Sequence, residues 1–129
     1  WKVPNDCAAL ADVVAREHGN IHRSGDLNAE ALMRLLERCD AIRQPERFAR
    51  VLQACECDAR GRLGFEEAAY PQAQRLMQAL QAAQSVVTAD IAAQASHEGL
   101  QGRLIGQRIE SARTAAIATW LNPFIAPEA

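Results

Sequence analysis

The sequence predicts an all-α protein, a compact bundle of five to seven helices with a long C-terminal helix. Apolar residues recur at the i, i+3, i+4 spacing of a helix along most of the 129 residues. Runs of Val, Ile, Thr and aromatic residues that alternate with polar ones, as strands require, are absent. Hydrophobic residues make up 49% of the chain but aromatic residues only 5%, and the many alanines favour close helix packing. We therefore expect helices without a sheet.

Three helices are expected in the first half of the chain. The first spans about residues 4–18, and Gly19 and Asn20 are expected to stop it in a left-handed turn. Asn28 is placed to cap the second helix, and Pro45 suits the first turn of the third. The apolar spacing predicts an inner face made of Cys7, Leu10, Val13, Val14, His18, Leu32, Leu35, Leu36, Cys39, Phe48, Val51, Leu52 and Cys55.

Three more helices are expected in the second half. They span about residues 69–86, residues 88–95 with Thr88 as the cap, and residues 99–121 with Asn122 and Pro123 at the end. The residues expected on their inner faces are Leu76, Met77, Leu80, Ala83, Leu104, Ile105, Ile109, Ala112, Ala116, Ile117 and Trp120.

The stretch 96–102, rich in glycine and polar residues, is the nearest thing to a linker. It divides the chain into a helical core, residues 1–95, and a linker with the last helix, residues 96–129. We expect the last helix either to pack against the core or to project from it.

The composition limits the classes of function. A net charge of −2 argues against a freestanding, strongly basic nucleic-acid binder, but it leaves room for a local arginine patch. The four cysteines form no CxxC pair, and Cys7, Cys39 and Cys55 fall on apolar helical positions, so we expect buried thiols in a reducing compartment. No apolar run reaches the roughly 18 residues of a membrane span, so we expect a cytoplasmic protein.

The stretch of residues 55–71, CECDARGRLGFEEAAYP, has the most particular pattern in the chain. Arg60 and Arg62 flank Gly61, where their guanidinium groups can reach carboxylates or phosphates. They are expected either to form ion pairs with Asp58 and Glu66 that fix the loop, which alternating charges favour, or to face RNA phosphates.

Two aromatic residues of the same stretch have expected structural roles. Phe65 is expected to pack the loop onto the core. Tyr70 and Pro71 are typical of the start of a helix, with the tyrosine ring packed backward.

His18 and His22 are four residues apart, which on a continuous helix would place two imidazoles on one face as metal ligands. Because Gly19 lies between them, we expect a helix end instead. Asp40 follows an apolar helix and is expected either to pair with Arg43 three residues later or to anchor the start of the next helix.

Residues 58–72 read DARGRLGFEEAAYPQ and resemble the DxRGRxGFExxxYPQ signature of bacterial CCA-adding enzymes, the tRNA nucleotidyltransferases. Four further stretches resemble segments of that family in the same order and with similar spacing. They are residues 14–22, 35–48, 99–109 and 115–120, so the resemblance covers most of the chain.

The resemblance implies an enzyme that adds C, C and A to tRNA 3′ ends from CTP and ATP with Mg²⁺. It implies that this part of such an enzyme supports tRNA binding. The candidate RNA-binding residues are Arg60, Arg62 and Arg23.

Enzymes of this type often carry an HD phosphohydrolase domain, in which histidines and aspartates hold a divalent metal. The resemblance makes residues 1–95 the C-terminal part of an HD-like domain. His18, His22 and Asp40 lie in matching stretches and are the candidate metal ligands, although Gly19 stands where some members have Asp.

The Asp-x-Asp carboxylates that bind metal in the catalytic head of this family have no match in the sequence. We therefore expect a C-terminal fragment that lacks the N-terminal nucleotidyltransferase domain, is catalytically silent alone and binds no cofactor. The alternative is a stand-alone helical interaction module with no enzyme parent.

Overall fold

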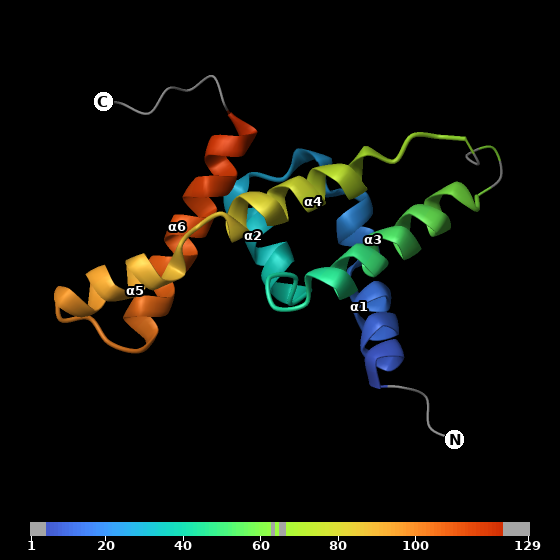
Figure 1. Cartoon of the computed structure of the whole chain (residues 1–129). Helices are drawn as coiled ribbons and strands as arrows, with labels where there is room; N and C mark the ends of the chain where they lie inside the picture. Colours follow the sequence, from blue (N-terminus) through green and yellow to red (C-terminus); the bar gives the residue numbers. More distant parts are fainter. Residues whose placement is uncertain (1–4, 63, 65–66, 123–129) are drawn as a thin grey trace.

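The computed structural model describes residues 5–62, 64 and 67–122, and these form helices without any strand (Figure 1). The elements in order are α1 (Asn5–His22), a short 3-10 helix η1 (Ser24–Asp26), α2 (Ala29–Arg38), α3 (Pro45–Arg60), α4 (Pro71–Gln84), α5 (Thr88–His97) and α6 (Arg103–Leu121). The prediction of an all-α protein with a long C-terminal helix is confirmed. None of the described helices is long and apolar enough to cross a membrane.

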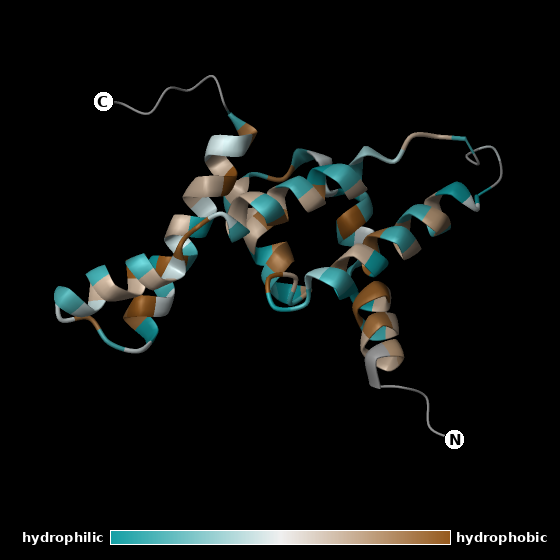
Figure 2. Cartoon of the chain, viewed as in Figure 1, coloured by the Kyte–Doolittle hydropathy of each residue, from teal (hydrophilic) through white to brown (hydrophobic). Residues whose placement is uncertain are grey.

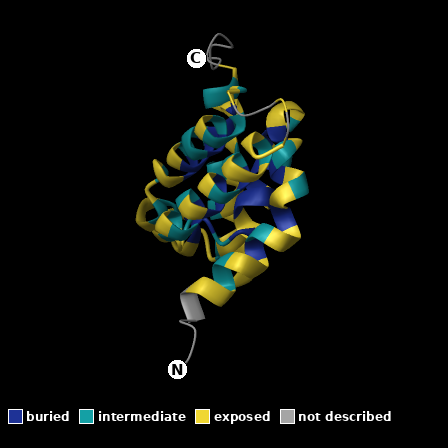
Figure 3. Ribbon diagram, turned by 90° about the vertical axis from the view of Figure 1, so that its right-hand side faces the viewer, coloured by how far each residue is buried: buried dark blue, intermediate teal, exposed yellow. Residues whose placement is uncertain are grey.

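The helices pack around one core (Figure 3). Helix α1 packs against α3 at one end of the molecule, and α5 pairs with α6 at the other (Figure 1). Helix α4 runs between them and contacts α6, α3 and α2. The largest fully buried side chains are Phe48, Ile21, Leu32, Met33, Leu35, Leu36, Leu52, Leu76, Leu80, Ile117, Val51 and Cys39.

Three helix starts follow the local chemistry of the sequence. The Asn28 side chain accepts a hydrogen bond of 2.9 Å from the Ala31 backbone N–H, which satisfies a donor at the start of α2. Pro45 and Pro71 occupy the first turns of α3 and α4, where a missing N–H costs nothing. The predicted cap of α2 and the two proline starts are therefore confirmed.

The predicted end of α1 at Gly19 is wrong, because the helix continues through Gly19 to His22. Glycine weakens a helix interior by about 1 kcal/mol relative to alanine, and tertiary packing overrides a preference of that size. Ile21, in the added turn, is fully buried. The expected burial of Cys7 at the other end of α1 is also wrong, since its thiol is exposed, whereas Cys39 and Cys55 are buried.

Helix α6 begins at Arg103 rather than at Gly99 because Gly99 and Gly102 both have positive φ, 87° and 55°, in the turn after α5. Its C-terminal half packs on the core through the fully buried Ile117. Its first turn does not, and Leu104, predicted to point inward, is 48% exposed. Figure 2 shows hydrophobic colour at this end of the α5–α6 hairpin.

The predicted roles of Phe65, Glu66 and Pro123 concern positions outside the described residues.

Candidate functional site

A pocket of about 420 Å³ lies where the end of α1, the end of α3 and the start of α4 meet. It brings together four of the six residues that the sequence singled out, while Arg60 and Asp40 do not line it. Helix α1 reaches the pocket only because it continues past Gly19. The lining residues are His18, Gly19, His22, Arg23, Ala59, Arg62, Tyr70 and Gln72.

His22 is held in place by hydrogen bonds on both ring nitrogens. Its Nδ1 lies 2.7 Å from the Tyr70 hydroxyl and its Nε2 lies 3.1 Å from a carboxylate oxygen of Asp58. Burial, together with the acidic groups of Cys55, Asp58 and Glu56, raises the Tyr70 pKa well above its ordinary value, so the hydroxyl stays protonated at neutral pH. The neutral ring satisfies both contacts when Tyr70 donates to Nδ1 and Nε2–H donates to Asp58.

Gln72 also belongs to the site, and the sequence reading did not assign it a role. Its side-chain N–H₂ group donates a hydrogen bond of 2.9 Å to the backbone carbonyl of His22. Tyr70 was expected only to pack, but it bonds to the same histidine. Both residues belong to the Tyr-Pro-Gln end of the loop pattern, and this part of the pattern is the sequence signal from which their roles could have been predicted.

The neighbouring His18 bonds to its own helix. Its Nδ1 lies 3.0 Å from the Val14 carbonyl oxygen, so Nδ1–H is the donor. The His18 and His22 rings lie edge to face with centroids 5.9 Å apart. The rings are close, but Nδ1 of His18 and both ring nitrogens of His22 already form hydrogen bonds within the protein.

Asp40 lies elsewhere, just after α2, with a φ of 53° and an ion pair of 3.3 Å to Arg43. The expected pair with Arg43 is confirmed. Within the described part of the chain, no three His, Cys, Asp or Glu side chains are grouped so that they fit a metal ion. His18, His22 and Asp40 therefore do not form one ligand set.

The three candidate arginines differ in what they contact. Arg60 bonds to Glu56 at 3.0 Å and to the Ala68 carbonyl at 3.2 Å, which ties the loop to α3. Arg62 is 67% exposed and 3.9 Å from Asp58, a loose pair. The partner of Arg60 is thus Glu56 of its own helix, and its bond to the Ala68 carbonyl is the contact that reaches the loop; Glu66, the other predicted partner, lies outside the described residues.

Arg23 is the most available of the three. Its only side-chain hydrogen bond among the described residues is one of 3.3 Å to the Asn20 side chain. Its guanidinium crosses the face of α1 at Gly19. Among the described residues, Arg23 and Arg62 line the pocket and no carboxylate does, while the Asp58 carboxylate lies beside it, 3.9 Å from Arg62.

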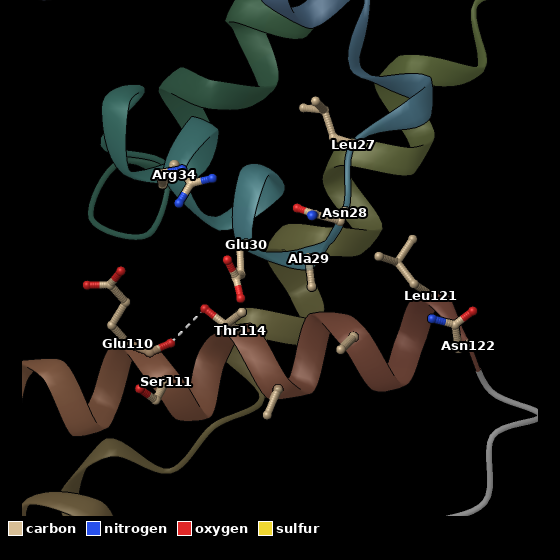
Figure 4. Close-up of a pocket in the computed structure, with 12 residues that line it drawn as sticks. Leu27, Asn28, Ala29, Glu30, Arg34, Glu110, Ser111, Thr114, Leu121 and Asn122 are labelled. Carbon is tan, nitrogen blue, oxygen red and sulfur yellow. Dashed lines mark hydrogen bonds between the residues drawn. The ribbon is translucent and has the colours of Figure 1, made fainter.

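A larger hollow, about 850 Å³, lies between the start of α2 and α6 (Figure 4). Its charged lining residues are Glu30, Glu110 and Arg34, and the Thr114 hydroxyl donates to the Glu110 backbone carbonyl at 2.9 Å. None of the candidate RNA-binding or metal-ligand residues lines it. The mixed charges give it no preference for an anion or a cation.

The fold and the site define an all-α protein with a pocket lined by arginine and histidine. The chain is 60% identical to the Multifunctional CCA protein of Acidovorax sp. (strain JS42) over 126 residues, 98% of this chain and 30% of that protein. It is 63% identical to the Multifunctional CCA protein of Paracidovorax citrulli and 64% identical to that of Verminephrobacter eiseniae, each over 93% of this chain and 29% of the relative. The chain is therefore homologous to a part of the multifunctional CCA proteins, which confirms the resemblance seen in its motifs.

The chain spans about 30% of the length of the curated relatives it matches. It matches no known protein-family profile and no solved structure.

Proposed function

We propose that the chain is the helical part of a CCA-adding tRNA nucleotidyltransferase that helps to hold tRNA. The observation that carries this proposal is the identity of about 60% to multifunctional CCA proteins over almost the whole chain. The pocket supports it, because Arg23 and Arg62 both line it and none of its described lining residues is a carboxylate. Guanidinium groups bind phosphate oxygens with paired hydrogen bonds.

Few phosphates can be neutralised by this surface. Among the described arginines, five lie in ion pairs closer than 3.5 Å with acidic side chains, and two more, Arg47 and Arg75, donate to backbone carbonyls. We expect weak tRNA binding by the isolated chain, with a salt dependence that corresponds to about two or three phosphate contacts. Tight tRNA binding then belongs to the whole enzyme.

A fluorescence anisotropy titration of labelled tRNA at several salt concentrations tests the proposal. The Arg23→Ala/Arg62→Ala double variant should lose most of the affinity and most of the salt slope. Arg103→Ala, at the exposed start of α6 and outside the pocket, is the matched control. If the double variant and Arg103→Ala lose the same affinity, or if the unmodified chain does not bind tRNA, the proposal is contradicted.

The isolated chain should add no CMP or AMP to tRNA that lacks its CCA end. Nucleotidyl transfer requires carboxylates that hold Mg²⁺ ions, and the Asp-x-Asp pair of the family's catalytic head has no match in this sequence. Incubation with radiolabelled CTP or ATP, Mg²⁺ and truncated tRNA measures this. The full-length Acidovorax relative is the positive control, and incorporation by the chain alone would contradict the assignment.

The family resemblance also implies HD-type phosphohydrolase activity in the whole protein. The described residues of this chain do not fit the metal such a site requires, because His18, His22 and Asp40 are not grouped together. We therefore derive no catalytic step from them, and in this proposal His22 fixes the shape of the arginine pocket.

A further inference from the structure

Gly19 lies inside a continuous helix, where glycine is among the least favourable residues. Its backbone does not require glycine, since its φ is not among the positive values of the chain. The neighbour that a side chain at this position would meet is Arg23. A Cβ on Gly19 would lie 3.3 Å from both terminal nitrogens of the Arg23 guanidinium. The missing side chain thus leaves room for the Arg23 guanidinium, whose two terminal nitrogens face Gly19.

Arg23 is one of the residues that line the pocket. Arg23 directly follows α1, and its backbone N–H donates to the Gly19 carbonyl oxygen at 3.2 Å, so the two residues lie one turn apart. Arg62 lines the same pocket from the turn after α3. Two arginine side chains that line one pocket match a tetrahedral oxyanion better than they match a neutral ligand.

Hydrogen bonds connect other polar groups of the pocket. His22 is fixed by Tyr70 and Asp58, and Gln72 is bonded to the His22 carbonyl. Asp58 does not line the pocket, and its carboxylate is directed to His22 at 3.1 Å and to Arg62 at 3.9 Å. The volume of about 420 Å³ is enough for a phosphate with an attached sugar.

We propose that this pocket binds one phosphate group of RNA through Arg23 and Arg62. We further propose that the absence of a side chain at Gly19 positions the Arg23 guanidinium for this contact, and we call this arrangement the seat. The choice of RNA as the source of the phosphate rests on the proposed function, whereas the seat itself rests on the geometry of Gly19 and Arg23. The phosphate belongs either to the RNA backbone, as a diester, or to an RNA end, as a monoester.

Gly19→Ala tests the seat without changing the charge of the protein. Alanine favours the helix, so the variant should fold at least as stably as the unmodified chain. Its Cβ forces the guanidinium to shift, and we expect affinity for a short single-stranded RNA to fall measurably, by less than in Arg23→Ala. Arg23→Lys, which keeps the charge but loses the paired donors, should weaken binding to a similar extent.

Gly106→Ala is the matched control, because Gly106 also lies inside a helix and a Cβ there meets nothing within 4 Å. It should leave the affinity unchanged. If Gly19→Ala binds RNA as tightly as Gly106→Ala while Arg23→Ala binds weakly, the seat is overturned and the proposed function stands. Equal losses in the two glycine variants would overturn the seat as well.

NMR signals of the arginine Nε–H groups, recorded during titration with inorganic phosphate, separate the two proposals. If the chain binds no RNA, the proposed function fails. In that case the seat is still supported if phosphate shifts the Arg23 signal in the unmodified chain and Gly19→Ala abolishes this shift. No shift of that signal in the unmodified chain overturns it. RNAs with and without a 3′-terminal phosphate identify the source, since only a monoester site favours the phosphorylated RNA.

Discussion

At the scale of single residues, the most unusual group in the core is Glu17, whose side chain is only 3% exposed. It accepts hydrogen bonds from Arg38 at 3.1 Å and from Asn20 at 3.0 Å, and Arg16 lies 3.4 Å away. A buried carboxylate is costly unless it is paired in this way. Because Arg38 comes from α2, Glu17 fastens α1 to α2.

Glu17→Gln should destabilise the protein at neutral pH by about 1–3 kcal/mol, since the hydrogen bonds to arginine lose their ionic partner. Burial by itself raises the pKa of the Glu17 carboxyl. The hydrogen bonds from Asn20 and Arg38, with the charges of Arg38 and Arg16, outweigh burial, and the folded pKa lies below the ordinary value of 4.5.

The lowered pKa fixes the direction of the pH dependence. The stability that ionised Glu17 contributes is fully present above its unfolded pKa and is lost as the pH falls through the lower folded pKa. Urea unfolding at pH 7 and at successively lower pH should therefore show the difference between the unmodified protein and Glu17→Gln shrinking in acid. A difference that stays constant with pH would mean that the charge of Glu17 does not contribute.

At the scale of elements, the local signals of the sequence were sufficient where they act within one turn of chain. The Asn28 cap and the Pro45 and Pro71 starts depend on the residues beside them, and all three are confirmed. The end of α1 was missed because its last turn is stabilised from outside, by the burial of Ile21 and by the bonds of His22 to distant residues. No periodicity within the segment contains that information.

The residues of the site that lie in recognisable sequence motifs were predictable. The loop after α3 indicated Arg62, and the segment at the end of α1 indicated His18, His22 and Arg23. Which arginine remains free depends on contacts across the fold, such as that of Arg60 with the Ala68 carbonyl. The role of Gly19 depends on where the Arg23 side chain lies, and the sequence alone does not reveal that position.

Asn28→Ala should destabilise the protein by about 1 kcal/mol, because the Ala31 N–H at the start of α2 loses its acceptor. Asn28→Asp keeps an acceptor at the cap and is the control. Chemical denaturation followed by circular dichroism measures both. If the two variants are equally destabilised, the loss comes from something other than the cap.

At the scale of the whole molecule, the question is whether the last helix shares the core or only follows it. The C-terminal half of α6 packs on α4 and α2, whereas its first turns pack on α5 (Figure 1). Arg75 of α4 adds a second link, since its guanidinium lies 5.7 Å from the centre of the Trp120 ring and donates to the Leu27 carbonyl at 3.2 Å. Residues before and after the turn 98–102 thus contribute to one apolar core.

This packing predicts unequal effects of two apolar substitutions on the same helix. Ile117→Ala should lower the free energy of unfolding by about 2–5 kcal/mol, because the side chain is fully buried among residues of other helices. Leu104→Ala should cost no more than about 0.5 kcal/mol, the range of surface substitutions, because that side chain is 48% exposed. Urea unfolding followed by circular dichroism should show a single transition in both variants. A second transition, or equal small losses, would mean that α6 unfolds apart from the core, so the helix would then be an appendage joined by the turn at 98–102.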